Sequence, residues 1–538
     1  MKTARPGADD AVETMGFPSS AGLAGDKVGD AGLPLPGLTG RTVPGNRCVL
    51  DRLCIYHVAS EMAPLVKTGG LADVVSALPK ALAKRGHEVH VALPAYRIAI
   101  RQAERLGLTW HATPMTIEAG GIDHHIGIGT VVIDGVRVHL LACNELFDRE
   151  GIYGPSPVND YDDNARRYSV FAKAALATPR GLGFDPHIAH AHDWQAGLVP
   201  VLRERGFGRT LPATRTIFTI HNIAYQGAFW PGDLRLTGLD PALLNSFQLE
   251  HHGRLNWMKA GIVFADRVTT VSHRYATEIQ QPEVAFGLDE VIRGTAYKLD
   301  GITNGIDANE WDPSRDPHLP ARYSAADLSG KARCKQVLRS DCQLVENGAC
   351  LLAVVSRLVE QKGIDLILDA VEPYILSGRM QLAVLGSGDL SLEQRLHWLA
   401  RKHPGWVYTS FGYNESLAHR FMGGADAFLM PSRTEPCGLT QMYALRYGTL
   451  PIVRLTGGLV DTVSDVTVPG GGTGFTFGPV DRGHFSSVID RAVGLYHHFP
   501  TEWNAAMHRA MACDNSWDRV ASKYEELYLE LCDPAASD

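Results

Sequence analysis

Short apolar runs alternate with longer amphipathic stretches along most of this chain, beginning at residue 54. The apolar runs have the length of buried strands, and the stretches between them repeat their apolar residues at helical spacing. Strands separated by helices predict a parallel sheet that is covered by helices on both faces. In the first half the expected strands are 54–60, 88–93, 188–192, 216–220 and 267–272, and the expected helices include 195–205 and 256–265.

A hairpin interrupts this first series. The segment TVVIDGVRVHLLA contains two alternating runs joined at Asp134-Gly135, a dipeptide that favours a tight turn between antiparallel strands. From about residue 304 the chain becomes polar and contains three prolines before a second alternating series begins. The strands expected in that series are 351–357, 380–386, 406–412 and 427–432, with helices from 365 and 392. The fold class is therefore predicted to be α/β, with two Rossmann-like, doubly wound units in tandem.

Four segments follow from this pattern. Residues 1–50 are rich in Gly, Ala and Pro, lack the apolar block of a signal peptide and carry too many acidic residues for a transit peptide, so we expect a disordered extension. Residues 51–310 are predicted to form the N-terminal domain and 311–512 the C-terminal domain. The remaining segment, 513–538, is expected to hold an amphipathic helix and a short tail.

Composition narrows the class of protein. The chain has 538 residues, of which 45% are hydrophobic and 20% charged, as in ordinary globular enzymes. A formal net charge of −8 gives no support for a nucleic-acid or acidic-membrane partner, and no apolar run is long enough to span a bilayer. The nine cysteines form no C-x-x-C pair, which favours reduced thiols in a cytoplasmic protein.

The stretch APLVKTGGLADVV, at 63–75, carries the first sign of chemistry. It places Lys67 just before Gly69 and Gly70, between an expected strand and an expected helix. Two glycines allow the backbone to approach a ligand closely, and amide N–H groups near a helix N-terminus attract anions. With the lysine charge beside them, these residues indicate a phosphate site. The arrangement differs from the common phosphate loop, because no G-x-x-x-x-G-K-[ST] occurs.

Chemically unusual residues also follow other predicted strands, where ligands of open parallel sheets bind. They are Asp193, Trp194, His221 and Asn222 in the first half, and Arg357, Lys362, Glu435, Cys437, Gly438, Leu439, Thr456, Gly457 and Gly458 in the second. Singly, each has an ordinary structural explanation, such as a buried histidine or a helix-capping carboxylate. Their recurrence at successive strand ends favours a site. An arginine and two lysines would neutralise a diphosphate without a metal and stabilise charge on a leaving group.

A metal alternative rests on the segment NDYDDN. Asp160 and Asp162 have the spacing with which many sugar-nucleotide enzymes hold a divalent ion. The pair does not follow an apolar strand, however, so we interpret it as an acidic cluster that orders a loop, and we predict no metal site.

Five motifs together resemble the bacterial glycogen synthases, the ADP-glucose-using branch shared with plant starch synthases. They are KTGGLADVV, HNIAYQG, SRLVEQKGIDL, PSRTEPCGLTQMYALRYGTLPIVR and TGGL, and the resemblance runs from about residue 53 to 531. It implies the GT-B architecture, with an interdomain active-site cleft and a last helix that crosses back to the N-terminal domain. It also implies transfer of glucose from ADP-glucose to the 4-hydroxyl at the non-reducing end of glycogen or a malto-oligosaccharide, with retention and without a metal or other cofactor.

The same resemblance assigns residues to roles. Those implied in catalysis are Glu435, His221, Asp193, Arg357 and Lys362. Those implied in substrate binding are Lys67, Gly69, Gly70, Asp73, Trp194, Asn304, Cys437, Gly438, Leu439, Thr456, Gly457 and Gly458. Arg357 and Lys362 would grip the donor diphosphate, and Glu435 would be the essential carboxylate.

Several alternatives stay open at this point. The family favours same-face attack assisted by a leaving phosphate oxygen, whereas a double displacement would need Glu435 as the nucleophile. Tyr443 stands where the wider superfamily has a second glutamate. Rival functions are a transferase that uses UDP-glucose or makes a small glucoside, and an inactive glucan-binding protein. A glycan phosphorylase is disfavoured, because no lysine motif for a pyridoxal cofactor is evident. The residues do not indicate the oligomeric state.

Overall fold

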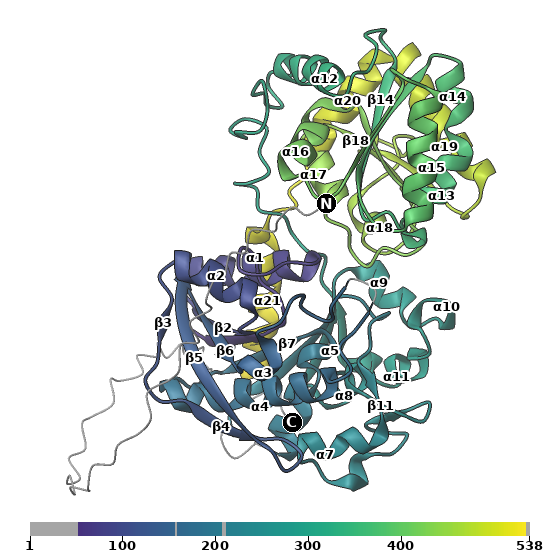
Figure 1. Cartoon of the computed structure of the whole chain (residues 1–538). Helices are drawn as coiled ribbons and strands as arrows, with labels where there is room; N and C mark the ends of the chain where they lie inside the picture. Colours follow the sequence, from purple (N-terminus) through teal and green to yellow (C-terminus); the bar gives the residue numbers. More distant parts are fainter. Residues whose placement is uncertain (1–51, 157–158, 207–210, 534–538) are drawn as a thin grey trace, which may run out of the picture. The chain divides into compact units, whose positions relative to one another are not determined.

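The computed structural model describes residues 52–156, 159–206 and 211–533, and the predicted N-terminal extension lies outside them (Figure 1). The described residues form a ten-stranded sheet, a six-stranded sheet and a small three-stranded sheet. Two doubly wound α/β units were predicted from the alternating pattern, and the two large sheets confirm them. No helix in these residues combines the length and apolar character that a bilayer crossing requires.

The first sheet has a parallel centre and an antiparallel edge. Its strands are β1 (Cys54–Val58), β2 (Glu88–Pro94), β3 (Thr109–Trp110), β4 (Met115–Glu118), β5 (Asp123–Ile133), β6 (Val136–Ala142), β7 (Ile188–His192), β8 (Arg215–Ile220), β12 (Arg267–Thr270) and β13 (Leu299–Gly301). They lie in the order β13-β12-β8-β7-β1-β2-β6-β5-β3, with β4 beside β5. The predicted hairpin is β5–β6, and Asp134 (φ 50°) and Gly135 (φ 85°) both adopt the positive φ that its tight turn requires.

Helices pack on this sheet through one continuous apolar core. They include α1 (Gly70–Lys84), α4 (Asn164–Leu182), α5 (Asp193–Ala196), α6 (Leu198–Arg205), α8 (Trp257–Phe264), α9 (His273–Glu278) and the last helix, α21 (Trp517–Cys532). The single helix expected over 195–205 is therefore two short helices that meet at Gly197. The last helix buries Tyr524 and Tyr528 in the same core, and its Glu525 accepts hydrogen bonds from Arg85.

Gly197 lies against the backbone of α8. A Cβ at this position would overlap the carbonyl oxygen of Trp257, whereas a Cβ at Gly181, in the last turn of α4, would meet no atom within 4 Å. We expect Gly197→Ala to lower the free energy of unfolding by about 1–3 kcal/mol, the usual cost of overpacking. Gly181→Ala is the matched control and should be neutral or stabilising. Equal melting temperatures for the two variants would contradict this packing.

The second sheet is entirely parallel, in the order β16-β15-β14-β17-β18-β19. Its strands are β14 (Cys350–Val355), β15 (Met380–Gly386), β16 (Val407–Phe411), β17 (Ala427–Met430), β18 (Leu450–Arg454) and β19 (Phe475–Phe477). Along β14, Leu352 and Val354 enter one apolar core, and Leu351 and Ala353 enter the other. Both faces are therefore covered, and the near-continuous apolar runs of this half are explained.

Two sets of helices cover these faces (Figure 1). One face carries α13 (Ile364–Ala370), α15 (Leu390–Lys402) and α19 (Arg482–His498), and the other carries α12 (Ser329–Asp341), α16 (Glu415–Gly424) and α17 (Thr440–Arg446). The sequence pattern did not predict α12, because this helix contributes few apolar residues, chiefly Cys334 and Leu338, to its core. All eight cysteines of the described residues are free thiols, and six of them are buried.

Strand order reverses direction at one place in each sheet. In the first sheet the chain runs outward from β1 on one side and from β7 on the other, and in the second sheet from β14 and β17. Ligands of doubly wound sheets bind beyond the carboxyl ends of the strands at such switch points. The residues that follow β1, β7, β14 and β17 are therefore the first to consider for a site.

Candidate active site

Glu435 is the central charged group beyond the second sheet. It follows β17 and is only 5% exposed. Lys362 places its Nζ 2.5 Å from the Glu435 Oε2, and the Ser432 hydroxyl donates to the same oxygen at 2.9 Å. Arg357, which follows the neighbouring strand β14, is exposed, and its guanidinium has no partner among the described residues. The two predicted basic residues thus differ, because Lys362 is already paired and Arg357 is available to a ligand.

The glycines at 457–458 allow a second loop to pack against the Glu435 segment. Gly457 has φ 45°, and a Cβ there would overlap the carbonyl oxygen of Glu435. A Cβ at Gly458 would overlap the carbonyl oxygen of Cys437. Gly438, at φ 73°, likewise needs the left-handed region that glycine tolerates. Close backbone packing around Glu435 therefore accounts for these residue types.

Some of the N–H and O–H groups that the sequence suggested as phosphate donors are hydrogen-bonded to carboxylates in this structure. Glu278 Oε2 accepts hydrogen bonds from the Thr456 hydroxyl at 3.1 Å and from the Gly457 amide at 3.0 Å. Glu61 accepts from the amides of Thr68 and Gly69. Two of the amides that we expected to attract an anion are thus already hydrogen-bonded to a carboxylate in this structure.

Glu61 organises the loop that carries Lys67. It is 3% exposed, and its carboxylate also accepts from the hydroxyls of Thr68, at 2.5 Å, and Tyr153. The sequence pattern did not predict a role for Glu61. Its position shortly after β1, near the carboxyl end of a parallel strand, is the one sequence feature that could have indicated it. Several amide and hydroxyl donors on one carboxylate make a rigid support, so we infer that Glu61 holds this loop in shape.

Lys67 extends from this supported loop. Its Nζ lies 2.6 Å from Asp73 Oδ1. Burial lowers the pKa of Lys67, but the attraction of Asp73 outweighs burial and the net pKa is raised, so the side chain is a cation at neutral pH. A Cβ at Gly70 would lie 3.9 Å from the Leu439 side chain, so the residues predicted from the two halves of the chain approach one another here.

Asp193 follows β7 in an unusual backbone conformation. Its φ is 56°, a value rare for residues other than glycine and frequent at functional sites. The Asp193 Oδ1 accepts from the amides of His221, at 2.7 Å, and Asn222, at 3.4 Å. Asp193 therefore ties the end of β7 to the end of β8. Partial burial raises the pKa of this carboxyl to about 7, although the two amides oppose the rise.

Trp194 and Asn304 differ in what they offer a ligand. Trp194 is 7% exposed and packs edge-on against Tyr168, so its ring is part of the core. Asn304 is also 7% exposed, but its side-chain Oδ1 is buried without a partner among the described residues, and its backbone N–H interacts with the thiol of Cys437. Asn304 thus has an unused acceptor, whereas Trp194 contributes packing.

The acidic cluster at 159–164 belongs to a loop before α4. Arg149 donates to both carboxylate oxygens of Asp163, at 2.7 and 2.6 Å. Asp160 and Asp162 belong to none of the groups of possible metal ligands in the described residues. These contacts support the interpretation that the cluster orders its loop.

The unusual pKa of Asp193 predicts a pH dependence. Burial lowers the pKa of His221 to about 3, so this imidazole stays neutral between pH 5 and 9, and Asp193 is the one of these two groups that titrates near pH 7. The ionised carboxylate is the better acceptor for the two amides, so we expect kcat/KM to fall as the pH drops below about 7. In Asp193→Asn this acid limb should disappear. A limb that persists at the same pH in the variant would contradict the assignment.

The raised pKa of Asp193 also makes the stability of the protein depend on pH. The folded state keeps the Asp193 proton up to about pH 7, whereas the unfolded chain releases it near its ordinary pKa of 3.8. This group therefore makes the protein less stable as the pH rises between those two values, and adds no further change above them. Melting temperatures of the wild type and Asp193→Asn should differ in their pH dependence within that window.

Comparison with known proteins decides the family. The profile of the starch synthase catalytic domain matches residues 54–294, and that of glycosyl transferases group 1 matches residues 349–493. Glycogen synthase of Anaeromyxobacter sp. (strain Fw109-5) is 47% identical over 484 residues, which cover 89% of this chain and 100% of that protein. The chain belongs to the glycogen synthase family. Glycogen synthase of Myxococcus xanthus (strain DK1622) is 43% identical over 482 residues, with 89% and 99% covered.

Solved structures place this glycogen synthase family member in the GT-B fold. The catalytic domain of starch synthase IV from Arabidopsis thaliana, bound to ADP and acarbose, has a TM-score of 0.82 and 34% identity, with 89% of this chain and 99% of that chain covered. Sucrose-phosphate synthase from Thermosynechococcus elongatus shares the fold alone, at a TM-score of 0.55 and 17% identity. The predicted fold class, family and glycosyltransferase activity are thereby confirmed.

Proposed function

We propose that this enzyme transfers glucose from ADP-glucose to the 4-hydroxyl at the non-reducing end of an α-1,4-glucan, with retention of the anomeric configuration. The observation that carries the proposal is the paired Lys362 and Glu435 beside an unpaired Arg357, at the switch point of the second sheet. ADP as the leaving group is supported by the related starch synthase structure, which is bound to ADP.

The basic residues fit a leaving diphosphate. Arg357 offers planar donors that no described residue uses, and such a fork matches phosphate oxygens. Lys362 adds a second charge but is shared with Glu435. Negative charge grows on the diphosphate as the glucosyl bond breaks, and fixed cations stabilise that charge in the transition state. Lys67, from the first half, would supply a third cation when the two halves close on the donor.

The environment of Glu435 favours same-face attack over a covalent intermediate. One of its oxygens is held by both Lys362 and Ser432, and a carboxylate in such bonds is a weaker nucleophile. In our proposal Glu435 binds sugar hydroxyls, and a leaving phosphate oxygen takes the proton of the acceptor. Mass spectrometry of the enzyme quenched during turnover should find no glucosyl group on Glu435. A trapped adduct at that residue would establish double displacement instead.

Product analysis tests the reaction itself. A malto-oligosaccharide incubated with ADP-glucose should lengthen, with one ADP released per glucose added, in buffer that contains EDTA. Proton NMR of the product should show only new α-1,4 linkages. A β linkage, or attachment at a position other than the 4-hydroxyl, would contradict the proposed stereochemistry or acceptor.

A further inference from the structure

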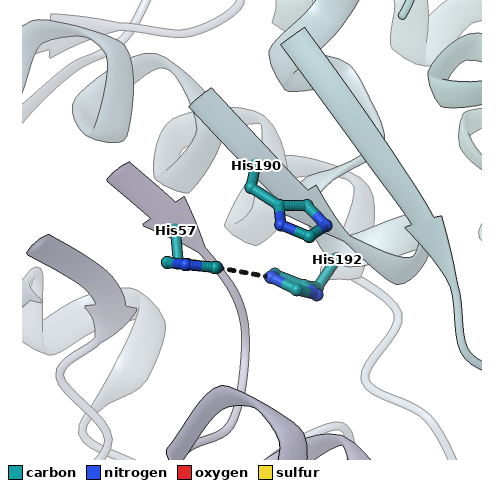
Figure 2. A group of neighbouring side chains, drawn as sticks. All are labelled: His57, His190 and His192. Carbon is teal, nitrogen blue, oxygen red and sulfur yellow. Dashed lines mark hydrogen bonds between the residues drawn. The ribbon is translucent and has the colours of Figure 1, made fainter. Parts of the chain in front are cut away.

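Three buried imidazoles form a hydrogen-bonded chain that leads to the candidate site. His57 lies on β1, His192 ends β7, and His221 follows β8. The His57 Nδ1 is 3.0 Å from the His192 Nε2, a contact drawn in Figure 2, and the His192 Nδ1 is 3.0 Å from the His221 Nε2. His57 and His192 have no exposed surface, and His221 is 9% exposed. One end of the chain is thus sealed in the core, and the other reaches the site.

The three hydrogen-bonded imidazoles permit two arrangements of their protons. Burial lowers the pKa of all three histidines, so each ring is neutral and carries one proton. Each of the two links needs a proton on one side only. Either every ring is protonated at Nδ1 and donates toward His221, or every ring is protonated at Nε2 and donates toward His57. The tautomer of one ring therefore determines the tautomers of the others.

The sealed end favours the first arrangement. The Nε2 of His57 is buried and has no hydrogen-bond partner among residues 52–156, 159–206 and 211–533. In the second arrangement this atom would be a buried N–H without an acceptor, which is rarer in proteins than a buried acceptor without a donor. Protonation at Nδ1 leaves only a bare nitrogen there. It also leaves the Nδ1–H of His221, at the open end, as a donor with no partner in the described protein.

We propose that His57 and His192 are positioning residues, which hold His221 in the Nδ1–H form so that it offers a hydrogen-bond donor to the sugar nucleotide. In this form the Nδ1 of His221 cannot take a proton from the acceptor, so His221 is not the general base. The proton arrangement rests on the burial of the three rings and on their hydrogen-bond geometry. That its recipient is a sugar nucleotide rests on the proposed function.

A metal site at these histidines is a weaker explanation. His57, His190 and His192 place their nitrogens close enough together to hold an ion. However, His190 already bonds Tyr528 through Nδ1, at 2.8 Å, and Thr219 through Nε2, at 2.5 Å. Because the nitrogens of His192 are also used, an ion would have to break several of these bonds. His190 instead joins the last helix to the first sheet.

Nitrogen NMR tests the proton arrangement without any substrate. In protein labelled with ¹⁵N-histidine, long-range proton–nitrogen spectra distinguish the two tautomers, and the His221 signals are identified by their loss in His221→Gln. We expect His221 to be protonated at Nδ1. Protonation at Nε2 would overturn the proposal, whether or not the enzyme uses ADP-glucose.

Substitution of His57 tests the positioning role. In His57→Asn the side-chain amide nitrogen lies close to the place of Nδ1 and still donates to His192, whereas His57→Leu removes the donor. We expect kcat to fall about tenfold in His57→Leu, the scale on which outer partners tune a functional histidine. His57→Asn should restore most of kcat and the Nδ1–H signal.

The matched control is His90→Leu. His90 is also buried and bonds a second imidazole, His139, at 2.9 Å, but that pair leads to Thr130 and not to His221. The His90→Leu variant should be less stable than the wild type but should leave the His221 NMR signals unchanged. Equal kcat in His57→Asn and His57→Leu would exclude positioning by this donor. If His57→Leu does not fold, the wild-type spectrum still decides the arrangement, and if no donor is turned over, only the proposed function fails.

Discussion

Replacing Glu435 with alanine is expected to lower kcat at least about a hundredfold, the scale on which one preorganised polar group contributes to a transition state. The carboxylate holds Lys362 and the Ser432 hydroxyl on one oxygen, so the variant leaves Lys362 without its partner and removes a charge that we propose to lie beside the reacting sugar. The measurement is the initial rate of glucose transfer at saturating donor, together with the far-ultraviolet circular dichroism of both proteins.

Two further variants separate charge from packing in this result. Glu435→Gln keeps the shape of the side chain and an acceptor for Ser432 but removes the charge, so its kcat should be reduced to a similar extent. Glu346, in an exposed loop before β14, has no side-chain partner among the described residues, and Glu346→Ala should retain full activity. A Glu435→Gln enzyme with near wild-type kcat would show that the charge is not required.

Lys67→Ala is expected to lower kcat/KM for the donor by about 10- to 150-fold, which corresponds to the roughly 1.5–3 kcal/mol of a hydrogen bond to a charged group. Lys67 is 44% exposed at its side chain and pairs with Asp73 at 2.6 Å, so part of its charge is already neutralised. For this reason we expect the effect to be smaller than that of Glu435→Ala. Steady-state kinetics with varied donor concentration measure it.

Lys84 is the matched control for Lys67. The loop that carries Lys67 leads into α1, and Lys84 lies at the opposite end of that helix. Lys84 is exposed in the last turn of α1, and Lys84→Ala should leave donor kinetics unchanged. Lys67→Arg keeps the charge and should recover part of the loss. An unchanged KM and kcat for the donor in Lys67→Ala would remove this residue from the site.

Much of the fold is predictable here, because the central parallel strands, such as β1, β7, β14 and β17, are buried on both faces and therefore stand out as apolar runs. The predicted strands at 188–192 and 380–386 coincide with β7 and β15, and the others differ by one or two residues at their ends. Asp134-Gly135 predicted its hairpin for a local reason, since both residues adopt positive φ. The domain limits at 310 and 512 stay predictions.

The residues missed from the sequence are recognised only by their partners in the folded structure, and some of these partners are far away along the chain. Glu278 reaches Gly457, 179 positions away, and no local pattern records such a contact. Glu61 looked like an ordinary residue after a strand, yet it takes the amides that were assigned to phosphate. The direction of the imidazole chain likewise depends on which buried nitrogen lacks a partner, and only a folded structure shows that. Residue types at strand ends were predictable, whereas their partners were not.

The most direct test of the proposed function is the transfer of radiolabelled glucose to glycogen from ADP-glucose and from UDP-glucose, measured side by side. We expect efficient transfer from ADP-glucose, much slower transfer from UDP-glucose, and loss of both in Glu435→Ala. Transfer from UDP-glucose alone would contradict the proposed donor while leaving the site in place. Transfer from neither donor, by a correctly folded protein, would contradict the proposed activity.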